Sequence, residues 1–331
     1  QPPSMAASAV TSLELGLSRA SRSLKSHLGG SFSRLQPLIE QALKVATSDA
    51  SLGDRVESIR LLRLGDARTL VQPLSDLLDA RQPVGVQVAA IQTLGRFDKD
   101  AGIGPILSHW MALSPNAKRE AAEVVFARAG RIDAVLKELE SRRIPPSEIE
   151  FARRKQMLAS TDSRIRERAE RALGADAGSD RNRVIARYQS SGLASGDPSQ
   201  GRLVFQQQCA TCHQAEGEGQ EVGPNLATVA ARAPEELLVA ILDPNREVAP
   251  TFLNYNVATT DGRVLSGILV EETSRALTLK RAEGAIDVVP RDQIEAVKSS
   301  GLSIMPEGME KMIDPTAMAN LIAFLRSLQA K

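Results

Sequence analysis

The chain has 331 residues, which is enough for two domains that each bury a core. With 41 basic and 40 acidic side chains it has a net charge of +1, which excludes the large basic field typical of nucleic-acid-binding proteins. It holds no run approaching the ~18 to 20 apolar residues of a membrane-spanning helix, and the partly apolar segment from Met5 to Leu17 lacks the basic start of a secretion signal.

The first half is predicted to be an array of helical repeats. Similar Pro-containing triplets begin at Gln36, Gln72 and Gly104, a period of about 32 to 36 residues. Each unit has the pattern of two amphipathic helices, such as Val56 to Arg63 followed by Ala67 to Leu78. This period is typical of HEAT-like solenoids, whereas tetratricopeptide repeats need aromatic residues at set points and aromatics make up only 3% of this chain. We therefore predict a HEAT-like repeat domain over residues 1–178.

A helix containing Val184, Ile185 and Tyr188 is predicted to follow the repeats. The stretch from Ser190 to Ser199 is then rich in Ser and Gly, a composition typical of flexible linkers. We place this helix and linker at residues 179–196 and a second domain at residues 197–331.

The run CATCH, from Cys209 to His213, contains both cysteines of the chain. A CxxCH run is the attachment signature of a c-type haem, in which the two thiols bond to the porphyrin and the histidine binds the iron. A zinc site would need about four ligands, but there is no third cysteine, and His27 and His109 lie far upstream. A thioredoxin-like dithiol expects strands that nothing before Gln208 predicts, although this dithiol, a metal site and chance occurrence stay open as alternatives. We predict one covalently bound haem c.

Two helices are predicted on either side of this run. The first begins with Asp197 as N-cap and Pro198 in the first turn, with Gln200 as capping-box partner. The second begins at Asp314 and Pro315 and has an apolar side made of Met318, Leu321, Ile322, Phe324 and Leu325. The pair resembles the terminal helices of class I cytochromes c, which cross where a glycine permits close approach. This resemblance implies that Gly201 and Phe205 meet Leu321 and Phe324.

The same resemblance implies the other haem contacts. An axial methionine in cytochromes c commonly precedes a proline, which singles out Met305 before Pro306 among the methionines after the run. Met309, Met312 and Met318 are the other candidates, and an open iron position is a further alternative. By the same resemblance, Pro224 packs on the haem and its carbonyl accepts the proton on the second ring nitrogen of His213.

Between these two ligands the pattern changes to short strands. Leu253, Tyr255 and Val257 alternate with polar residues, and Asp261-Gly262 predicts a hairpin turn. Three more strands are predicted at 264–270, 276–280 and 286–289, and a last apolar pair is Ile294 and Val297. About five short strands in so little sequence favour a small SH3-like or Sm-like barrel inserted at residues 250–300.

The strings CATCH, VGPNL, ILDPNREV, DGRVLSGIL, MPEGM and NLIAFLRSL together resemble the PVC-type haem-binding CxxCH domain, a bacterial family. The resemblance covers about Asp197 to Gln329 and implies a cytochrome c fold with a β insert, in which Cys209, Cys212, His213 and Met305 hold the haem. Arg232 and Arg246 are possible partners of the haem propionates. The predicted fold class is thus mainly α: a HEAT-like solenoid followed by a helical haem domain with an inserted small β-barrel.

The expected function is electron transfer with His/Met ligation, as the cytochrome module of a periplasmic dehydrogenase or as its partner, without enzymatic activity of its own. Because haem c is attached outside the cytoplasm in bacteria, the chain is expected to be periplasmic or otherwise exported, as a mature product or a piece of a longer protein. A peroxidase-like haem enzyme or sensor with an open iron site is one alternative. A repeat scaffold with a structural haem is another.

Overall fold

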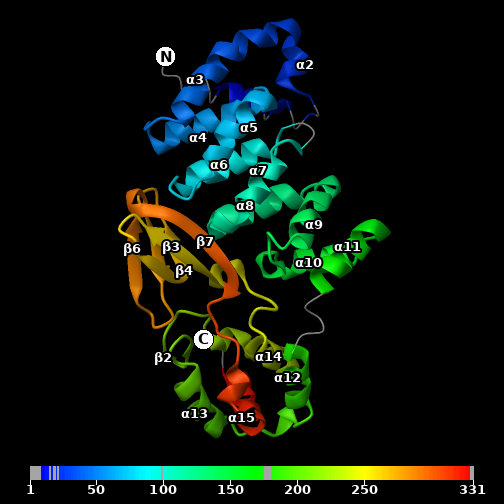
Figure 1. Ribbon diagram of the computed structural model, residues 1–331, viewed down its shortest axis with the longest axis vertical. Helices are drawn as coiled ribbons and strands as arrows, with labels where there is room; N and C mark the ends of the chain where they lie inside the picture. Colours follow the sequence, from blue (N-terminus) through cyan, green and yellow to red (C-terminus); the bar gives the residue numbers. More distant parts are fainter. Residues whose placement is uncertain are drawn as a thin grey trace. The chain divides into compact units, whose positions relative to one another are not determined.

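A computed structural model of the protein describes residues 9–14, 16–17, 20, 22–97, 100–174 and 180–328, which are mainly helical with a β-sheet in the C-terminal half (Figure 1). The chain divides into two compact units. One comprises the chain up to Val135 with Glu272–Ala276 and Pro290–Val297, and the other comprises Leu136–Glu271, Leu277–Val289 and the chain from Lys298 onward. The boundary predicted at residues 178 and 179, the end of the resemblance at Gln329 and part of the Met5 to Leu17 segment lie outside the described residues.

Short helices with facing apolar sides build the first unit. Side-chain oxygens of Ser51, Asp66 and Ser114 accept backbone N–H groups and so begin α4, α5 and α8. Helices α4, α6 and α8 pack against one another in turn, and α5 packs on α7. The predicted helix pair is present as α4 with η2, followed by α5. The helices and 3-10 turns up to residue 140 are α2 (Leu24–Leu28), η1 (Gly29–Leu35), α3 (Gln36–Ala46), α4 (Leu52–Leu61), η2 (Leu62–Leu64), α5 (Ala67–Asp76), α6 (Val84–Leu94), α7 (Ile103–Ser108), η4 (Trp110–Ala112), α8 (Pro115–Phe126), η5 (Ala129–Arg131) and α9 (Ile132–Glu140).

The helices beyond residue 140 include those predicted on either side of the CATCH run. They are α10 (Phe151–Leu158), α11 (Ser163–Gly174), α12 (Asp180–Gln189), α13 (Pro198–Gln208), α14 (Pro234–Leu242) and α15 (Pro315–Ser327). Single 3-10 turns are η6 (Pro146–Glu148), η7 (Leu193–Ser195), η8 (Leu226–Val229), η9 (Pro250–Phe252), η10 (Arg291–Gln293) and η11 (Met309–Lys311).

Five strands form one sheet in the order β6-β5-β4-β3-β7. They are β3 (Leu253–Thr259), β4 (Val264–Glu272), β5 (Ala276–Lys280), β6 (Ile286–Pro290) and β7 (Ile294–Ser303). The predicted alternation along β3 is present, since every second side chain from Leu253 is buried. Strands β3 and β4 are antiparallel with Tyr255 opposite Gly267, and their turn holds Gly262 at a φ of 84°. All five predicted strands are present, while closure of the sheet into a barrel stays a prediction.

The two ends of this β segment meet. The backbone N–H of Ile304, just after β7, donates a hydrogen bond to the carbonyl of Phe252, just before β3, at 3.1 Å. Strands β3 and β7 are also neighbours in the sheet. The chain therefore returns, after β7, to the place where it entered the sheet.

Helices α13 and α15 begin at the predicted caps. The carboxylate of Asp197 accepts the N–H of Ser199, and that of Asp314 accepts the N–H groups of Thr316 and Ala317. The capping-box role predicted for Gln200 is not found, because the N–H of Asp197 donates to Asn320 Oδ1 at 2.8 Å instead. A contact to α15 thus replaces the local bond.

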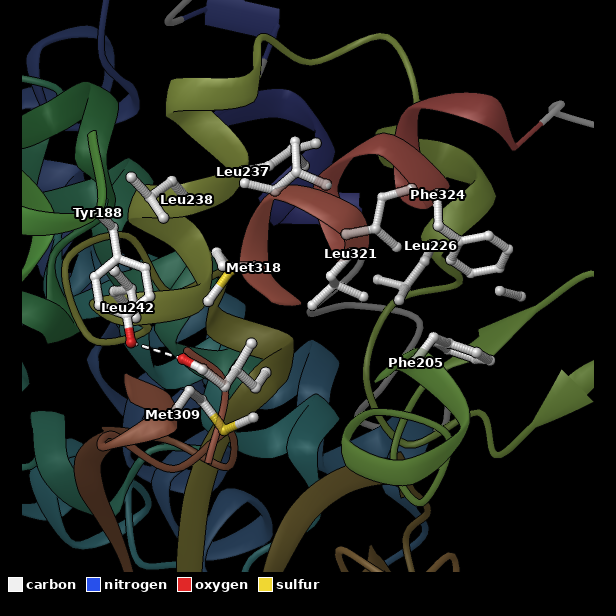
Figure 2. Packing of buried hydrophobic residues seen from close by; sticks show 14 of the residues in the cluster. Tyr188, Phe205, Leu226, Leu237, Leu238, Leu242, Met309, Met318, Leu321 and Phe324 are labelled. Atoms are coloured by element: carbon white, nitrogen blue, oxygen red, sulfur yellow. Dashed lines mark hydrogen bonds between the residues drawn. The ribbon is translucent and has the colours of Figure 1, made fainter. Parts of the chain in front are cut away.

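The crossing of α13 and α15 depends on Gly201. A Cβ at this position would lie 1.9 Å from the carbonyl oxygen of Asn320 and 2.7 Å from the Cβ of Phe324. The absence of a side chain lets the two backbones touch. Next to this contact the rings of Phe205 and Phe324 pack with centroids 5.6 Å apart and planes tilted by 40° (Figure 2). The predicted meeting of Gly201 and Phe205 with Phe324 is therefore present.

Helix α12 belongs to the same core as α13, α14 and α15. Its Ile185 and Tyr188 are buried in one hydrophobic cluster with residues of those helices, including Phe205, Leu238, Leu242, Met318, Leu321 and Phe324 (Figure 2). The prediction from the sequence groups this helix with the linker. Its apolar side indicates that the helix is buried, but the sequence does not indicate which element it packs against. In the structure it packs on α14.

Polar bonds fasten α12 to the segment that precedes α15. The hydroxyl of Tyr188 donates to the carbonyl of Ile313 at 2.6 Å (Figure 2). Arg181 makes two hydrogen bonds, of 2.9 and 2.7 Å, to the carboxylate of Glu310, and the two side chains are only 20% and 14% exposed. The Arg181 guanidinium lowers the pKa of Glu310 below its ordinary value. This ion pair ties α12 to η11.

We expect Glu310→Gln to weaken this part of the protein in a pH-dependent way. Because the pKa of Glu310 is lower in the folded state, its contribution is fully present above the pKa of an unfolded Glu, about 4.3, and is lost as the pH falls through the lower folded value. The expected loss at pH 7 is about 1.5–3 kcal/mol, the range for hydrogen bonds to charged groups. Urea unfolding followed by circular dichroism at pH 7 and below pH 4 measures it. An equal difference between the two proteins at both pH values would contradict the prediction.

Candidate functional site

The CATCH run folds into a tight turn directly after α13. The N–H of Cys209 donates to the carbonyl of Phe205 at 2.8 Å, so this residue still continues the hydrogen bonding of the helix. The N–H groups of Cys212 and His213 both donate to the carbonyl of Cys209, at 3.0 and 2.8 Å. Two thiols and an imidazole are thereby carried by a single turn.

Both cysteines are free thiols and are partly buried. Burial raises the pKa of Cys209 to about 12, with a further contribution from Cys212. Burial also raises the pKa of Cys212, and the carboxylate of Glu283 adds to this effect. The two side chains are therefore neutral thiols at neutral pH.

The imidazole of His213 is oriented by a hydrogen bond to Pro224, the bond that the resemblance to cytochromes c implies. Its Nδ1 lies 2.9 Å from the Pro224 carbonyl, and because a carbonyl oxygen only accepts, Nδ1 carries the proton. Burial lowers the pKa of the ring, although the bond to Pro224 opposes this shift. The described residues make no hydrogen bond to Nε2, so the neutral ring presents the lone pair of this atom.

Glycines allow the following loop to fold back on the run. A Cβ on Gly223 would lie 2.4 Å from Cε1 of His213, and one on Gly219, which has a φ of 90°, would lie 2.1 Å from the His213 carbonyl. The N–H groups of Val222 and Gly223 donate to the Cys212 carbonyl at 3.0 and 2.7 Å. The short ladder of β1 (Gln214–Ala215) and β2 (Glu218–Gly219), which the sequence did not predict, lies within this loop.

The turn between β5 and β6 lies against the run. The Cys212 thiol donates to the carbonyl of Ala282 at 3.2 Å. The ammonium group of Lys280 donates to the carbonyl of Glu221. The β segment therefore contacts the turn that carries the two thiols.

The four methionines after the run have different surroundings. Met309 and Met318 are buried in the hydrophobic cluster, and Met312 is 58% exposed. Met305 lies in the loop between β7 and η11, is partly buried and packs against the same cluster as Cys209. Of the four, Met305 alone combines a loop position with a partly accessible side chain at this cluster.

A family model for cytochrome c matches residues 199–269. The chain contains a cytochrome c-like haem-binding domain. The matched residues include Cys209, Cys212, His213 and Pro224, and they end within β4, before Met305. The family indicates covalently bound haem c, with its iron, and haem-based electron transfer for the cytochrome c-like domain.

The side chains of the cytochrome c-like domain fit a c-type haem. Two free thiols two residues apart match the two covalent attachments, and an imidazole with an unengaged Nε2 matches the iron ligand. Gly223 leaves the ring of His213 room that any larger residue would fill.

The two predicted propionate partners differ in their surroundings. Arg232 is exposed, and its side chain has no hydrogen bond or ion pair among the described residues. Arg246 is bonded to Asp243 at 2.8 Å and also donates to the side chain of Asn182. Arg246 thus has protein partners already, whereas the exposed side chain of Arg232 has none within the part of the chain that the structure describes.

Sequence reasoning missed the bonds made by two polar residues: Asn245, within the matched residues, and Arg181, in α12 before them. Asn245 bonds to Ser303 and Arg181 to Glu310, which lie 58 and 129 residues further along the chain, so no local pattern predicts the bonds.

Two further findings concern only the described residues. No group of three or more His, Cys, Asp and Glu could hold a metal ion, and no helix is long and apolar enough to cross a membrane.

Proposed function

We propose that the cytochrome c-like domain is a one-haem electron carrier with His213 and Met305 as the axial ligands of the iron. The observation that carries this proposal is the hydrogen bond from His213 to Pro224, within a CxxCH turn, which leaves Nε2 as the free ligand atom. Cys209 and Cys212 supply the covalent bonds. Met305 supplies a thioether, which raises the reduction potential relative to a second nitrogen ligand.

When bound, the haem supplies an iron that gains and loses one electron. The protein binds and orients this group: Cys209 and Cys212 anchor the porphyrin, and Pro224 fixes the tautomer and orientation of His213. The hydrophobic cluster keeps water away from the side where Cys209 and Met305 pack. The β5–β6 turn covers the Cys212 side, in keeping with a role of the β segment in shielding the haem edge.

The proposal extends to the rest of the chain. The domain is of the PVC type with an inserted small β-barrel, and HEAT-like repeats over residues 1–178 precede it. The repeats present the haem to a redox partner or a fused dehydrogenase in the periplasm or another exported location. Successive contacts of α4, α6 and α8 support the repeat part, because repeat units bury their apolar sides against neighbours.

The test is the absorption spectrum of ferric holoprotein carrying Met305→Ala. A weak band near ~695 nm is a general mark of Met-ligated ferric haem c, and we expect it in the wild type and not in the variant. The reduction potential should fall by on the order of 0.1–0.3 V, within the ~0.8 V range that axial ligands set. Met312→Ala is the matched control, since this side chain is exposed. A band that survives in Met305→Ala would exclude Met305 as the ligand.

A further inference from the structure

The loop that carries Met305 is held by one side chain at both of its ends. Asn245 Oδ1 accepts the N–H of Ser303 at 2.8 Å, two residues before Met305. Asn245 Nδ2 donates to Oε1 of Glu307 at 2.6 Å, two residues after it. The same carboxamide therefore spans the methionine.

The carboxamide of Asn245 is well suited to make both bonds. It offers an acceptor and a donor on one planar group, whereas a carboxylate only accepts and an alanine does neither. A third bond closes the loop from inside, since the N–H of Met305 donates to Oγ of Ser303 at 3.1 Å. The position of the Met305 backbone thus depends on where Asn245 is held.

Asn245 itself sits on a fixed turn after α14. Pro244, which is buried, restricts the backbone on one side. On the other side Arg246 bonds to Asp243 at 2.8 Å and to the side chain of Asn182 in α12. Because this turn is anchored independently of the Met305 loop, it can serve as the support of that loop.

We propose that Asn245 is a positioning residue that holds the thioether of Met305 on the haem iron. The inference rests on the proposed ligation by Met305. In this role Asn245 acts through Ser303 and Glu307: it keeps these two residues at a fixed separation, so that the loop between them does not open. Loss of Asn245 lets the thioether leave more often and gives competing ligands access to the iron.

The experiment compares ferric holoproteins of wild type, Asn245→Ala and Asn256→Ala, with imidazole as the competing ligand. Asn256 is the matched control, because its side chain makes one bond to Ser266 on the sheet. In Asn245→Ala we expect a weaker band near ~695 nm and imidazole binding faster by roughly tenfold, since two hydrogen bonds hold the closed loop. Asn256→Ala should match the wild type in both.

Glu307→Ala is a second test variant in case Asn245→Ala does not fold. It removes only one of the two bonds of Asn245, and it does so at an exposed residue. It should increase the imidazole rate by less than Asn245→Ala, with an unchanged urea midpoint. If Asn245→Ala has the band intensity and the imidazole binding rate of the wild type, the inference about Asn245 is wrong, while the ligation by Met305 is unaffected. If Asn245→Ala does not fold, the same result in Glu307→Ala decides. A wild type without the band would instead overturn the Met305 ligation, and the inference with it.

Discussion

Replacing both Cys209 and Cys212 by alanine is expected to yield protein with no covalently bound haem. In the proposed attachment each thiol forms one thioether with the porphyrin, so without both sulfurs the cofactor would be held only by weaker, reversible bonds to the iron. The intact mass under denaturing conditions measures the result directly. The wild type should carry the mass of one haem and the double variant none.

The single variants Cys209→Ala and Cys212→Ala are the controls, since each keeps one attachment point. Cys209 is the more buried thiol, next to the hydrophobic cluster, and Cys212 lies at the β5–β6 turn. Haem that remains attached in the double variant would show that the porphyrin is bonded elsewhere. The CATCH run would then not be its attachment site.

Gly201→Ala is expected to destabilise the cytochrome c-like domain by about 3 kcal/mol or more, the upper range for overpacking. The added Cβ would lie 1.9 Å from the Asn320 carbonyl oxygen and 2.5 Å from its carbon. These are backbone atoms of α15, which cannot turn aside as a flexible side chain does. The two helices must separate, and the contact of Phe205 with Phe324 weakens with them.

The matched control for this variant is Gly104→Ala. Gly104 lies within α7, is exposed and has nothing within 4 Å of the position of a Cβ, so alanine there should stabilise by up to about 1 kcal/mol. Urea unfolding of the holoprotein compares the two, followed by the haem absorption for Gly201→Ala and by circular dichroism for Gly104→Ala, because Gly104 lies in the other unit. Equal midpoints for Gly201→Ala and the wild type would mean that the helices do not cross as described.

Elements that depend on neighbouring residues could be predicted from the sequence. Asp197 and Asp314 each stand before a proline, and this local pattern identified the starts of α13 and α15. Strand β3 followed from its alternation, which a half-buried strand imposes on consecutive residues. The ladder of β1 and β2 has two residues on each side, too few for any periodicity to be visible.

Contacts between distant residues could not be predicted in this way. Nothing near Asn320 indicates that its side chain takes the N–H of Asp197, which displaced the expected capping box. Tyr188 lies on the apolar face of its helix, but the carbonyl to which its hydroxyl donates belongs to Ile313, 125 residues later. The candidate site shows the same division. Cys209, Cys212 and His213 are recognisable from their spacing and Pro224 from a resemblance, whereas the support that Asn245 gives to the Met305 loop appears only when the chain is folded.

The bond between Phe252 and Ile304 has a consequence for how the C-terminal half of the chain folds. A structured insertion whose entry and exit points coincide costs the host little more loop-closure entropy than a short hairpin of a few residues would. Once these strands have formed, α15 can search for α13 as though some fifty intervening residues were missing. The β segment therefore lengthens the effective path between the two helices only slightly.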